Sequence, residues 1–296
     1  EICACLVGSE MCIRDRRFQG GYLFLQYIYY SLGLNRVCRK IRDKHQFEYD
    51  LNAILSDLIY TRVMEPSSKR SSYKAACGFL EKPGYELHDV YRALSVLAQE
   101  SDLIQAELYK NSNFLTKRND HILYYDCTNY YFEIEQDDDF RKYGKSKESR
   151  PNPIVTMGLF MDADGIPLAF DVFPGNQNEQ TTLKPLETKI IRDFACSEFI
   201  FCSDAGLGSK ANRRFNSFGN RSYVISQSLK KMRREDRQIA LNPKQFRRLG
   251  SNKFIDISTL DESDPDIYET IFYKEVPVVN GDMDEIVIVT YSPKYK

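Results

Sequence analysis

The spacing of apolar positions divides the chain into a helical part followed by a part with strand character. Between residues 18 and 118 apolar side chains recur every three or four positions, as in Leu51, Ile54 and Leu58. This period is that of an amphipathic helix, so we expect a bundle of helices in this part of the chain. Beyond residue 119 the period falls to two, which is typical of half-buried strands.

The region after residue 119 predicts the element order βββαβαβ. Strands are expected at residues 121–128, 154–161, 167–172, 199–203 and 223–226, and helices at residues 180–194 and 209–218. The second and third strands are separated by Asp-Ala-Asp-Gly, so Asp162 and Asp164 are assigned to a hairpin turn and left out of the site. Three antiparallel strands, a crossover helix and a parallel strand form the layout of the ribonuclease H-like nuclease fold.

The sequence predicts four segments within a mixed α/β protein. Residues 1–16 resemble translated sequencing-adapter sequence and are taken as a non-native extension. Residues 17–118 form a helical domain expected to bind DNA, residues 119–228 form an incomplete ribonuclease H-like core, and residues 229–296 form a basic segment and a partial β-rich insertion. The chain stops just after a strand signal, so we expect it to be a fragment.

Within the helical part, two short stretches leave two interpretations open. Residues 31–41 read as a turn followed by a basic helix, and residues 65–70 read as a loop that ends one helix and caps the next. Both stretches fit a helix-turn-helix, and both fit a plain bundle with a solvated basic face.

Composition narrows the class of protein. The chain has 296 residues, of which 42% are hydrophobic and 28% charged, so it can bury a sizeable core. No apolar run approaches the roughly 18 to 20 residues of a membrane-spanning helix. The eight cysteines contain no CxxC pair, and the three histidines stand apart from any nucleophile motif. A zinc site and a Ser/His/Asp or Cys/His mechanism therefore have little support.

The net charge of −1 hides two blocks of opposite sign. Residues 205–253 hold thirteen lysines or arginines against two acids, whereas residues 254–296 hold ten acids against three lysines. A basic block of this kind indicates contact with a polyanion, although a solvated helix face is the usual explanation of a charge run.

Two aspartates are the candidate metal ligands. Asp126 and Asp204 each close an apolar run, and either one alone is best explained as a turn former at the end of a strand. As a pair on neighbouring strands they would hold one or two divalent ions, Mg²⁺ or Mn²⁺. Such ions promote hydrolysis or transfer of a phosphodiester without a histidine base.

Four motifs resemble those of the DDE transposases of bacterial insertion sequences, in the branch whose nuclease core is interrupted by a β-rich insertion. They are YYDCTNYYF at 124–132, YGKSKESRPNP at 143–153, MGLFMDADGIPLAFDVFPG at 157–175 and CSDAGLGS at 202–209. The resemblance implies that Asp126 and Asp204 are the first two catalytic acids. It implies a third acid, a Glu on a helix beyond residue 296. Glu275 and Glu285 lie in strand-like runs and are not assigned to it, so we expect this chain alone to be inactive.

The resemblance also implies the partners. The complete protein would cut transposon ends with water and join the freed 3′-hydroxyl to target DNA, assembled on DNA as a homodimer in the bacterial cytoplasm. The residues expected to contact DNA are Lys145, Lys147, Arg150, Lys210, Asn212, Arg213, Arg214, Lys230 and Lys231. For the loop that carries Lys142, Lys145, Lys147 and Arg150, local charge compensation by Asp137, Asp138 and Asp139 is the alternative. A non-catalytic DNA-binding protein and another ribonuclease H-like nuclease remain competing functions.

Overall fold

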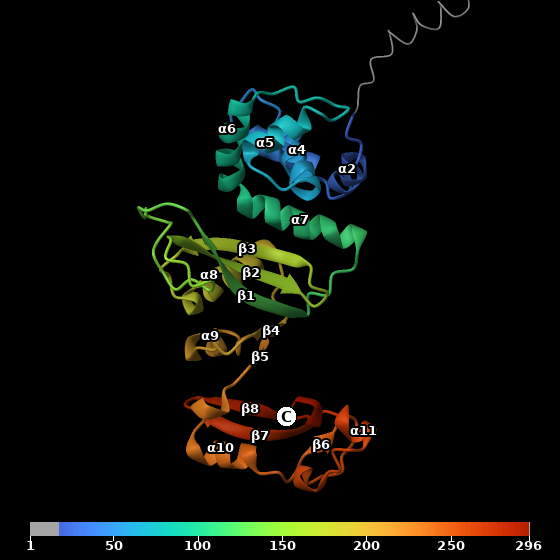
Figure 1. The fold of residues 1–296 in the computed structure, drawn as a ribbon, viewed down its shortest axis with the longest axis vertical. Coiled ribbons are helices and arrows are strands. Elements are labelled where there is room, and N and C mark those ends of the chain that lie inside the picture. Colours follow the sequence, from blue (N-terminus) through green and yellow to red (C-terminus); the bar gives the residue numbers. More distant parts are fainter. Residues whose placement is uncertain (1–17, 296) are drawn as a thin grey trace, which may run out of the picture. The chain divides into compact units, whose positions relative to one another are not determined.

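A computed structural model describes residues 18–295, which divide into two compact units (Figure 1). The first comprises residues 18–119 with 189–195, and the second comprises residues 120–188 with 196–295. The extension expected at residues 1–16 lies outside the described residues. Among residues 18–295, no helix combines the length and the apolar character that crossing a bilayer requires.

The first unit is helical, as its apolar period predicts. Its helices are α2 (Tyr22–Ser31), α3 (Leu34–Lys44), α4 (Leu51–Met64), α5 (Lys69–Ala76), α6 (Leu87–Gln99) and α7 (Ser101–Leu115). One core cluster gathers aliphatic side chains such as Ile41, Ile54 and Val90, and a second gathers the rings of Tyr22 and Phe79, which stack with centroids 4.4 Å apart. Burial of these faces supplies most of the stability of such helices.

Capping residues set the boundaries of two of these helices. The side chain of Asp50 accepts a hydrogen bond from the main-chain N–H of Ala53 at the start of α4, and the side chain of Ser68 accepts one from Ser71 at the start of α5. The interpretation of residues 65–70 as a loop that ends one helix and caps the next is therefore confirmed.

Helices α2 and α3 are joined by a tight turn in which Gly33 has a φ of 68°, a value that favours glycine. The face of α3 that carries Val37 and Ile41 is buried, and the opposite face is basic. Two of its lysines, Lys40 and Lys44, pair with glutamates of the same unit. The helix-turn-helix stays a prediction, because a bundle with a basic face has these same features.

The second unit contains a five-stranded mixed sheet with the order β3-β2-β1-β4-β5. Its elements are β1 (Ile122–Tyr131), β2 (Ile154–Asp162), β3 (Pro167–Pro174), α8 (Glu179–Asp193), β4 (Ile200–Ser203), α9 (Lys210–Phe215) and β5 (Ser222–Ile225). Strands β1 to β3 are antiparallel neighbours, whereas β4 is parallel to both β1 and β5. This order is that of the ribonuclease H-like fold, so the predicted mixed α/β class and the βββαβαβ order are confirmed.

Alternation along β1 separates the two faces of the sheet. Leu123, Tyr125 and Cys127 are buried, and the Tyr125 hydroxyl lies 2.6 Å from Thr182 Oγ1 on α8. Tyr124 and Asp126 lie on the other face, which is more open. Helix α8 therefore covers the apolar face and leaves the face that carries Asp126 accessible.

The predicted end of the first strand was wrong. Strand β1 does not end near Asp126 but continues to Tyr131, because the polar residues that follow still pair with β2 as far as Ile154. Pro185 lies inside α8 and not in its first turn, so the helix tolerates one missing main-chain N–H there.

The part of the second unit beyond residue 228 contains a small antiparallel sheet with the order β6-β7-β8. Its elements are η1 (Leu229–Lys231), α10 (Arg234–Leu241), β6 (Arg247–Arg248), η2 (Ile257–Thr259), α11 (Pro265–Tyr268), β7 (Phe272–Asn280), β8 (Met283–Tyr291) and η3 (Pro293–Tyr295). Strand β7 begins only at Phe272, because Asp264 caps the short helix α11 ahead of it. Pro277 is accommodated in β7 at a position that β6 does not pair.

A buried carboxyl group lies beneath the sheet of the second unit. Glu187 on α8 has no exposed surface, and its Oε2 accepts a hydrogen bond from Asn216 Nδ2 at 3.1 Å. Its Oε1 and the Oδ1 of Asn216 are both buried without a hydrogen-bond partner in the described structure. Burial raises the pKa of Glu187 to about 7, although its Asn216 hydrogen bond and Arg221 oppose the shift. The fold therefore favours the protonated carboxyl group.

We expect replacement of Glu187 by Gln to flatten the pH dependence of stability. A carboxyl group whose pKa is higher in the folded state stabilises the fold fully below its unfolded pKa of 4.5, and this contribution disappears as the pH rises through about 7. The wild type should lose about 3 kcal/mol of unfolding free energy across that window relative to E187Q. Urea unfolding between pH 4 and 8 measures this difference.

The control variant is E275Q, because Glu275 is an exposed carboxylate on β7. It should retain the wild-type pH dependence. Parallel stability curves for wild type and E187Q would show that the buried carboxyl group titrates normally.

Candidate metal and DNA site

Asp126 lies within β1, and Asp204 is the first residue after β4, the parallel neighbour of β1. The register of β1 and β4 pairs Ile122 with Ile200 and Tyr124 with Cys202, so each aspartate follows the last pair of this ladder by two residues. Adjacent strands are about 4.8 Å apart, and residues two apart share a face. That the two carboxylates converge on a shared metal stays a prediction.

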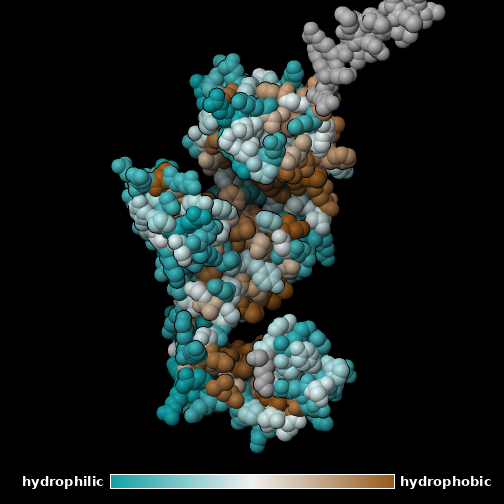
Figure 2. Space-filling model, viewed as in Figure 1, coloured by the Kyte–Doolittle hydropathy of each residue, from teal (hydrophilic) through white to brown (hydrophobic). Residues whose placement is uncertain are grey.

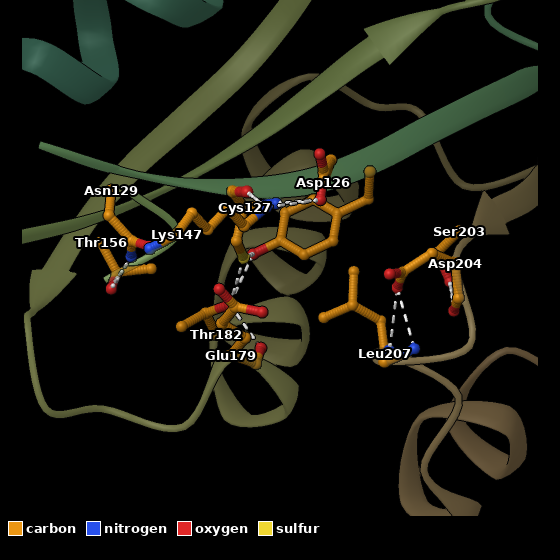
Figure 3. A network of polar contacts seen from close by, with 12 residues as sticks. Asp126, Cys127, Asn129, Lys147, Thr156, Glu179, Thr182, Ser203, Asp204 and Leu207 are labelled. Atoms are coloured by element: carbon orange, nitrogen blue, oxygen red, sulfur yellow. Dashed lines mark hydrogen bonds and ion pairs between the residues drawn. The ribbon is translucent and has the colours of Figure 1, made fainter. Parts of the chain in front are cut away.

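Asp204 combines the turn role and the ligand role that its sequence position allows. Its Oδ1 accepts hydrogen bonds from the main-chain N–H groups of Gly206 and Leu207 at 3.0 and 3.2 Å (Figure 3). These bonds fix the turn after β4. Within the described part of the chain, Oδ2 accepts no hydrogen bond. One oxygen therefore orients the carboxylate and the other remains available.

Asp126 is exposed to solvent, with 69% of its side chain accessible. Its Oδ1 accepts a hydrogen bond from the main-chain N–H of Cys127 at 2.8 Å and lies 3.5 Å from Lys147 Nζ (Figure 3). Its Oδ2 accepts no hydrogen bond from any residue between 18 and 295. Solvent and Lys147 thus compensate the charge.

The donor set suits a hard divalent cation. Mg²⁺ is commonly held by one or two carboxylates, with water and substrate phosphates completing its shell. Asp126 and Asp204 each offer a free carboxylate oxygen that fits this requirement. Across residues 18–295 no group of three or more His, Cys, Asp or Glu side chains is arranged to hold a metal, so the pair stands without a third protein ligand.

Both aspartates line a cleft of about 1080 Å³ between the five-stranded sheet and β8. Polar side chains such as Lys147 and Tyr223 contribute to the cleft, and the opposite part of its wall is apolar. Val224 on β5 and Ile286 and Ile288 on β8 are 59%, 65% and 61% exposed. Figure 2 shows hydrophobic surface on both sides of this hollow.

A buried ion pair fixes the small sheet against the core. Arg213 Nη1 lies 3.1 Å from both carboxylate oxygens of Glu285 on β8, and the Tyr223 hydroxyl donates a short hydrogen bond to the same carboxylate. Burial pushes the pKa of Glu285 upward, but the hydrogen bonds from Tyr223 and Arg213 outweigh it and leave that pKa below its usual range. Glu285 lines the cleft, yet its charge is already satisfied by Arg213.

The structure therefore gives Arg213 and Asn212 internal partners. The remaining donors of Arg213 reach the Gly208 carbonyl at 3.0 Å and Gln227 Oε1 at 2.7 Å. Asn212 is 4% exposed, and its Nδ2 donates to the main-chain carbonyls of Gln180 and Leu207. Both side chains hold α9 in place, so neither is positioned to contact DNA without rearrangement.

Other predicted DNA-binding residues remain at the surface. Lys210 and Arg214 are each 58% exposed and pair with Asp282, whose pKa is lowered mainly by the hydrogen bond from Lys210. Arg150 lies over the Tyr131 ring at 4.8 Å and pairs with Glu148. Lys145, Lys230 and Lys231 are exposed, and none of the three has an ion-pair partner among the described residues.

The charge compensation expected in the 133–153 loop is present for Lys142, one of the four basic residues for which it was expected. Asp137 pairs with Lys142 at 3.2 Å, and Asp138 pairs with Arg141. Lys147 instead contacts Asp126. Sequence reasoning missed Asp282 and Glu285 as partners of α9; the only signal was the complementary charge of the two blocks, because Arg213 and Glu285 are 72 residues apart.

Comparison with known proteins supplies little beyond this geometry. No family model matches the chain, and no curated protein matches it. Solved structures similar to part of it include a Mos1 transposase paired-end complex with the left transposon end, at 12% identity and a TM-score of 0.26, covering 61% of this chain and 60% of that one. A Mos1 mariner paired-end complex with Mn shows 14% identity, a TM-score of 0.24 and 62% coverage of both chains. A pre-cleavage Mos1 transpososome shows 13% identity, a TM-score of 0.24 and coverage of 61% and 60%.

The chain thus spans about three-fifths of the length of these Mos1 transposases. The class defined by the strand order is the ribonuclease H-like fold.

The two arginines of α9 provide a matched test of the ion pairs. Replacement of Arg213 by Gln should cost about 3 kcal/mol of unfolding free energy, because it leaves the buried Glu285 charge without its partner. Replacement of Arg214 by Gln should cost less than about 1 kcal/mol, because its pair with Asp282 is exposed. Urea unfolding followed by circular dichroism measures both values. Equal losses would contradict the structural role of Arg213.

Proposed function

We propose that the second unit is the DNA-processing core of a DDE-type transposase related to those of bacterial insertion sequences, with Mg²⁺ or Mn²⁺ held by Asp126 and Asp204. The observation that supports this proposal is the parallel pairing of β1 with β4, whose last pair Asp126 and Asp204 each follow by two residues, each with a carboxylate oxygen that accepts no hydrogen bond from the described residues. The motifs around both residues add the resemblance to this family.

The chemistry follows from the ligands. A bound divalent metal would activate a water or 3′-hydroxyl oxygen and neutralise charge on the phosphodiester. The turn after β4 orients Asp204 through its Oδ1, and the main chain of Cys127 orients Asp126. Little is asked of a protein acid or base, which suits a site without a histidine.

The proposed DNA surface consists of exposed basic side chains of the second unit. We include Lys145, Lys147, Arg150, Lys210, Arg214, Lys230 and Lys231, because each is accessible enough to reach a phosphate. The proposed substrates are transposon ends and target DNA, bound by a homodimer assembled on DNA in the bacterial nucleoid. The basic face of α3 is a second proposed contact in the helical unit.

A non-catalytic DNA-binding protein is the second candidate function. It is favoured by the lack of a third metal-ligand side chain beside the two aspartates among residues 18–295. Another ribonuclease H-like nuclease would share the site but prefer a different substrate. Metal binding distinguishes the proposed transposase from a non-catalytic DNA-binding protein. Competition between transposon-end DNA, RNA and branched DNA distinguishes it from another ribonuclease H-like nuclease.

Substitution of either aspartate should weaken metal binding. We expect D126N and D204N each to reduce Mn²⁺ affinity at least tenfold, because each removes one of only two anionic ligands. Electron paramagnetic resonance of free Mn²⁺ during titration measures this affinity. The control is D164N, since Asp164 is an exposed residue of the β2–β3 turn. Wild-type Mn²⁺ affinity in D126N and D204N would sink the metal site.

The basic residues of η1 should contribute to DNA affinity by neutralising phosphates. Replacement of Lys230 and Lys231 by Gln should lower the slope of log affinity against log salt concentration by about 0.9 for each phosphate of duplex DNA that the variant no longer neutralises. Fluorescence anisotropy with a labelled duplex across a salt series measures the slope. The control K294Q removes a lysine that already pairs with Glu269, and it should leave the slope unchanged. An unaltered slope in the double variant would show that Lys230 and Lys231 are solvated and do not contact DNA phosphates.

A further inference from the structure

Lys147 already occupies the candidate metal site with a positive charge. Its ammonium group lies 3.5 Å from Asp126 Oδ1 and donates a short hydrogen bond to the main-chain carbonyl of Cys127. Figure 3 shows this lysine lying along β1 beside Cys127. The pair is accessible, with 47% of the Lys147 side chain and 69% of the Asp126 side chain exposed. It is therefore weak enough to exchange partners.

The loop that carries Lys147 is fastened on both sides of this contact. On one side, Lys142 and Ile154 exchange main-chain hydrogen bonds of 3.0 and 2.8 Å. On the other, the main-chain N–H of Lys147 donates to Asn129 Oδ1 at 3.2 Å, and Asn129 Nδ2 donates to Thr156 Oγ1 at 3.1 Å. The loop backbone is thus bound to β1 through Asn129 and to β2 through Ile154. These contacts place the ammonium group of Lys147 beside β1.

A glycine contact explains part of the YGKSK motif. A Cβ atom built on Gly144 would lie 2.0 Å from the main-chain oxygen of Gly175, and one built on Gly175 would lie 2.0 Å from that of Ile154. Only glycine permits this approach. The motif therefore seats the loop through Gly144 and presents Lys147 to the carboxylate three residues later.

We propose that Lys147 is a positioning residue that stands in for the metal at Asp126 and is released to a DNA phosphate when a divalent cation binds. Two cations on one carboxylate repel each other, so metal binding and the Lys147–Asp126 pair compete. Because the backbone of Lys147 remains anchored to Asn129, the released ammonium stays at the edge of the site, where a phosphate can accept its charge. This inference rests on the proposed function and assigns Lys147 a second, metal-linked task.

The proposal predicts an opposite effect of one substitution on two ligands. Removing the charge with K147M should raise Mn²⁺ affinity about three- to tenfold in the absence of DNA, because the competing cation is gone. The same variant should weaken the gain in DNA affinity that a divalent cation produces, because no ammonium is freed for the phosphate. A merely structural lysine would produce neither pattern.

The experiment combines Mn²⁺ titration by electron paramagnetic resonance with anisotropy of a labelled duplex in Ca²⁺ or in EDTA. K147R retains the charge and should stay within about twofold of wild type in both measurements. K145M removes a neighbouring exposed lysine of the same loop and should leave Mn²⁺ affinity unchanged, which separates the local pair from general electrostatics. Far-UV circular dichroism of each variant checks that the fold is retained.

Unchanged or weaker Mn²⁺ binding by folded K147M would overturn the inference. D126N distinguishes this failure from failure of the proposed function. If wild-type protein binds Mn²⁺ and D126N does not, the metal site stands and only the role of Lys147 falls. If neither wild type nor K147M binds Mn²⁺, the metal site itself is absent and both proposals fall.

Discussion

The parallel pairing of β1 with β4 is the constraint on which the candidate site depends. Only three Cα pairs form this ladder, and Asp126 and Asp204, which are 78 positions apart in the numbering, each follow its last pair by two residues. The ladder is held from the buried side, where the Phe160 ring lies 4.7 Å from that of Tyr125 and 6.4 Å from that of Phe201. A slip of one residue would turn one carboxylate towards α8, so the apolar packing of one face fixes the polar geometry of the other.

The second constraint is electrostatic and links the small sheet to the core. Arg213 and Glu285 are 15% and 9% exposed, whereas Lys210, Arg214 and Asp282 are each at least half exposed. A largely buried ion pair resists exchange because either partner alone would be a desolvated charge. Exposed pairs exchange readily with other ions. Helix α9 thus carries Arg213, whose ion pair resists exchange. It also carries Lys210 and Arg214, whose exposed charges can exchange their partner for a phosphate.

The sequence was sufficient for the order of elements but not for their partners. The periods of two and of three to four predicted the helical unit and the βββαβαβ core, and the Asp-Ala-Asp-Gly turn behaved as expected, with Asp162 Oδ1 accepting from the main-chain N–H groups of Asp164 and Ile166. The end of β1 was placed at residue 128 and not at Tyr131 because Asn129 is polar, yet Asn129 sits on a strand whose pairing is decided by β2. Periodicity reports burial, and it carries no information about a partner strand that satisfies the backbone of polar residues.

The contacts around the site were beyond local pattern because they join distant segments. Lys147 and Asp126 are 21 residues apart, and their meeting depends on a loop whose course is set by main-chain packing at Gly144 and Gly175. The charge blocks indicated only the sign of such contacts. A chain with a net charge of −1 can nevertheless offer a surface to a polyanion if its exposed cations hold acids that a phosphate can replace. Lys147 at Asp126 and Lys210 at Asp282 both meet that condition, whereas Arg213 at Glu285 does not. Exposure of each pair, and not the count of basic residues, therefore decides which cations belong to the proposed DNA surface.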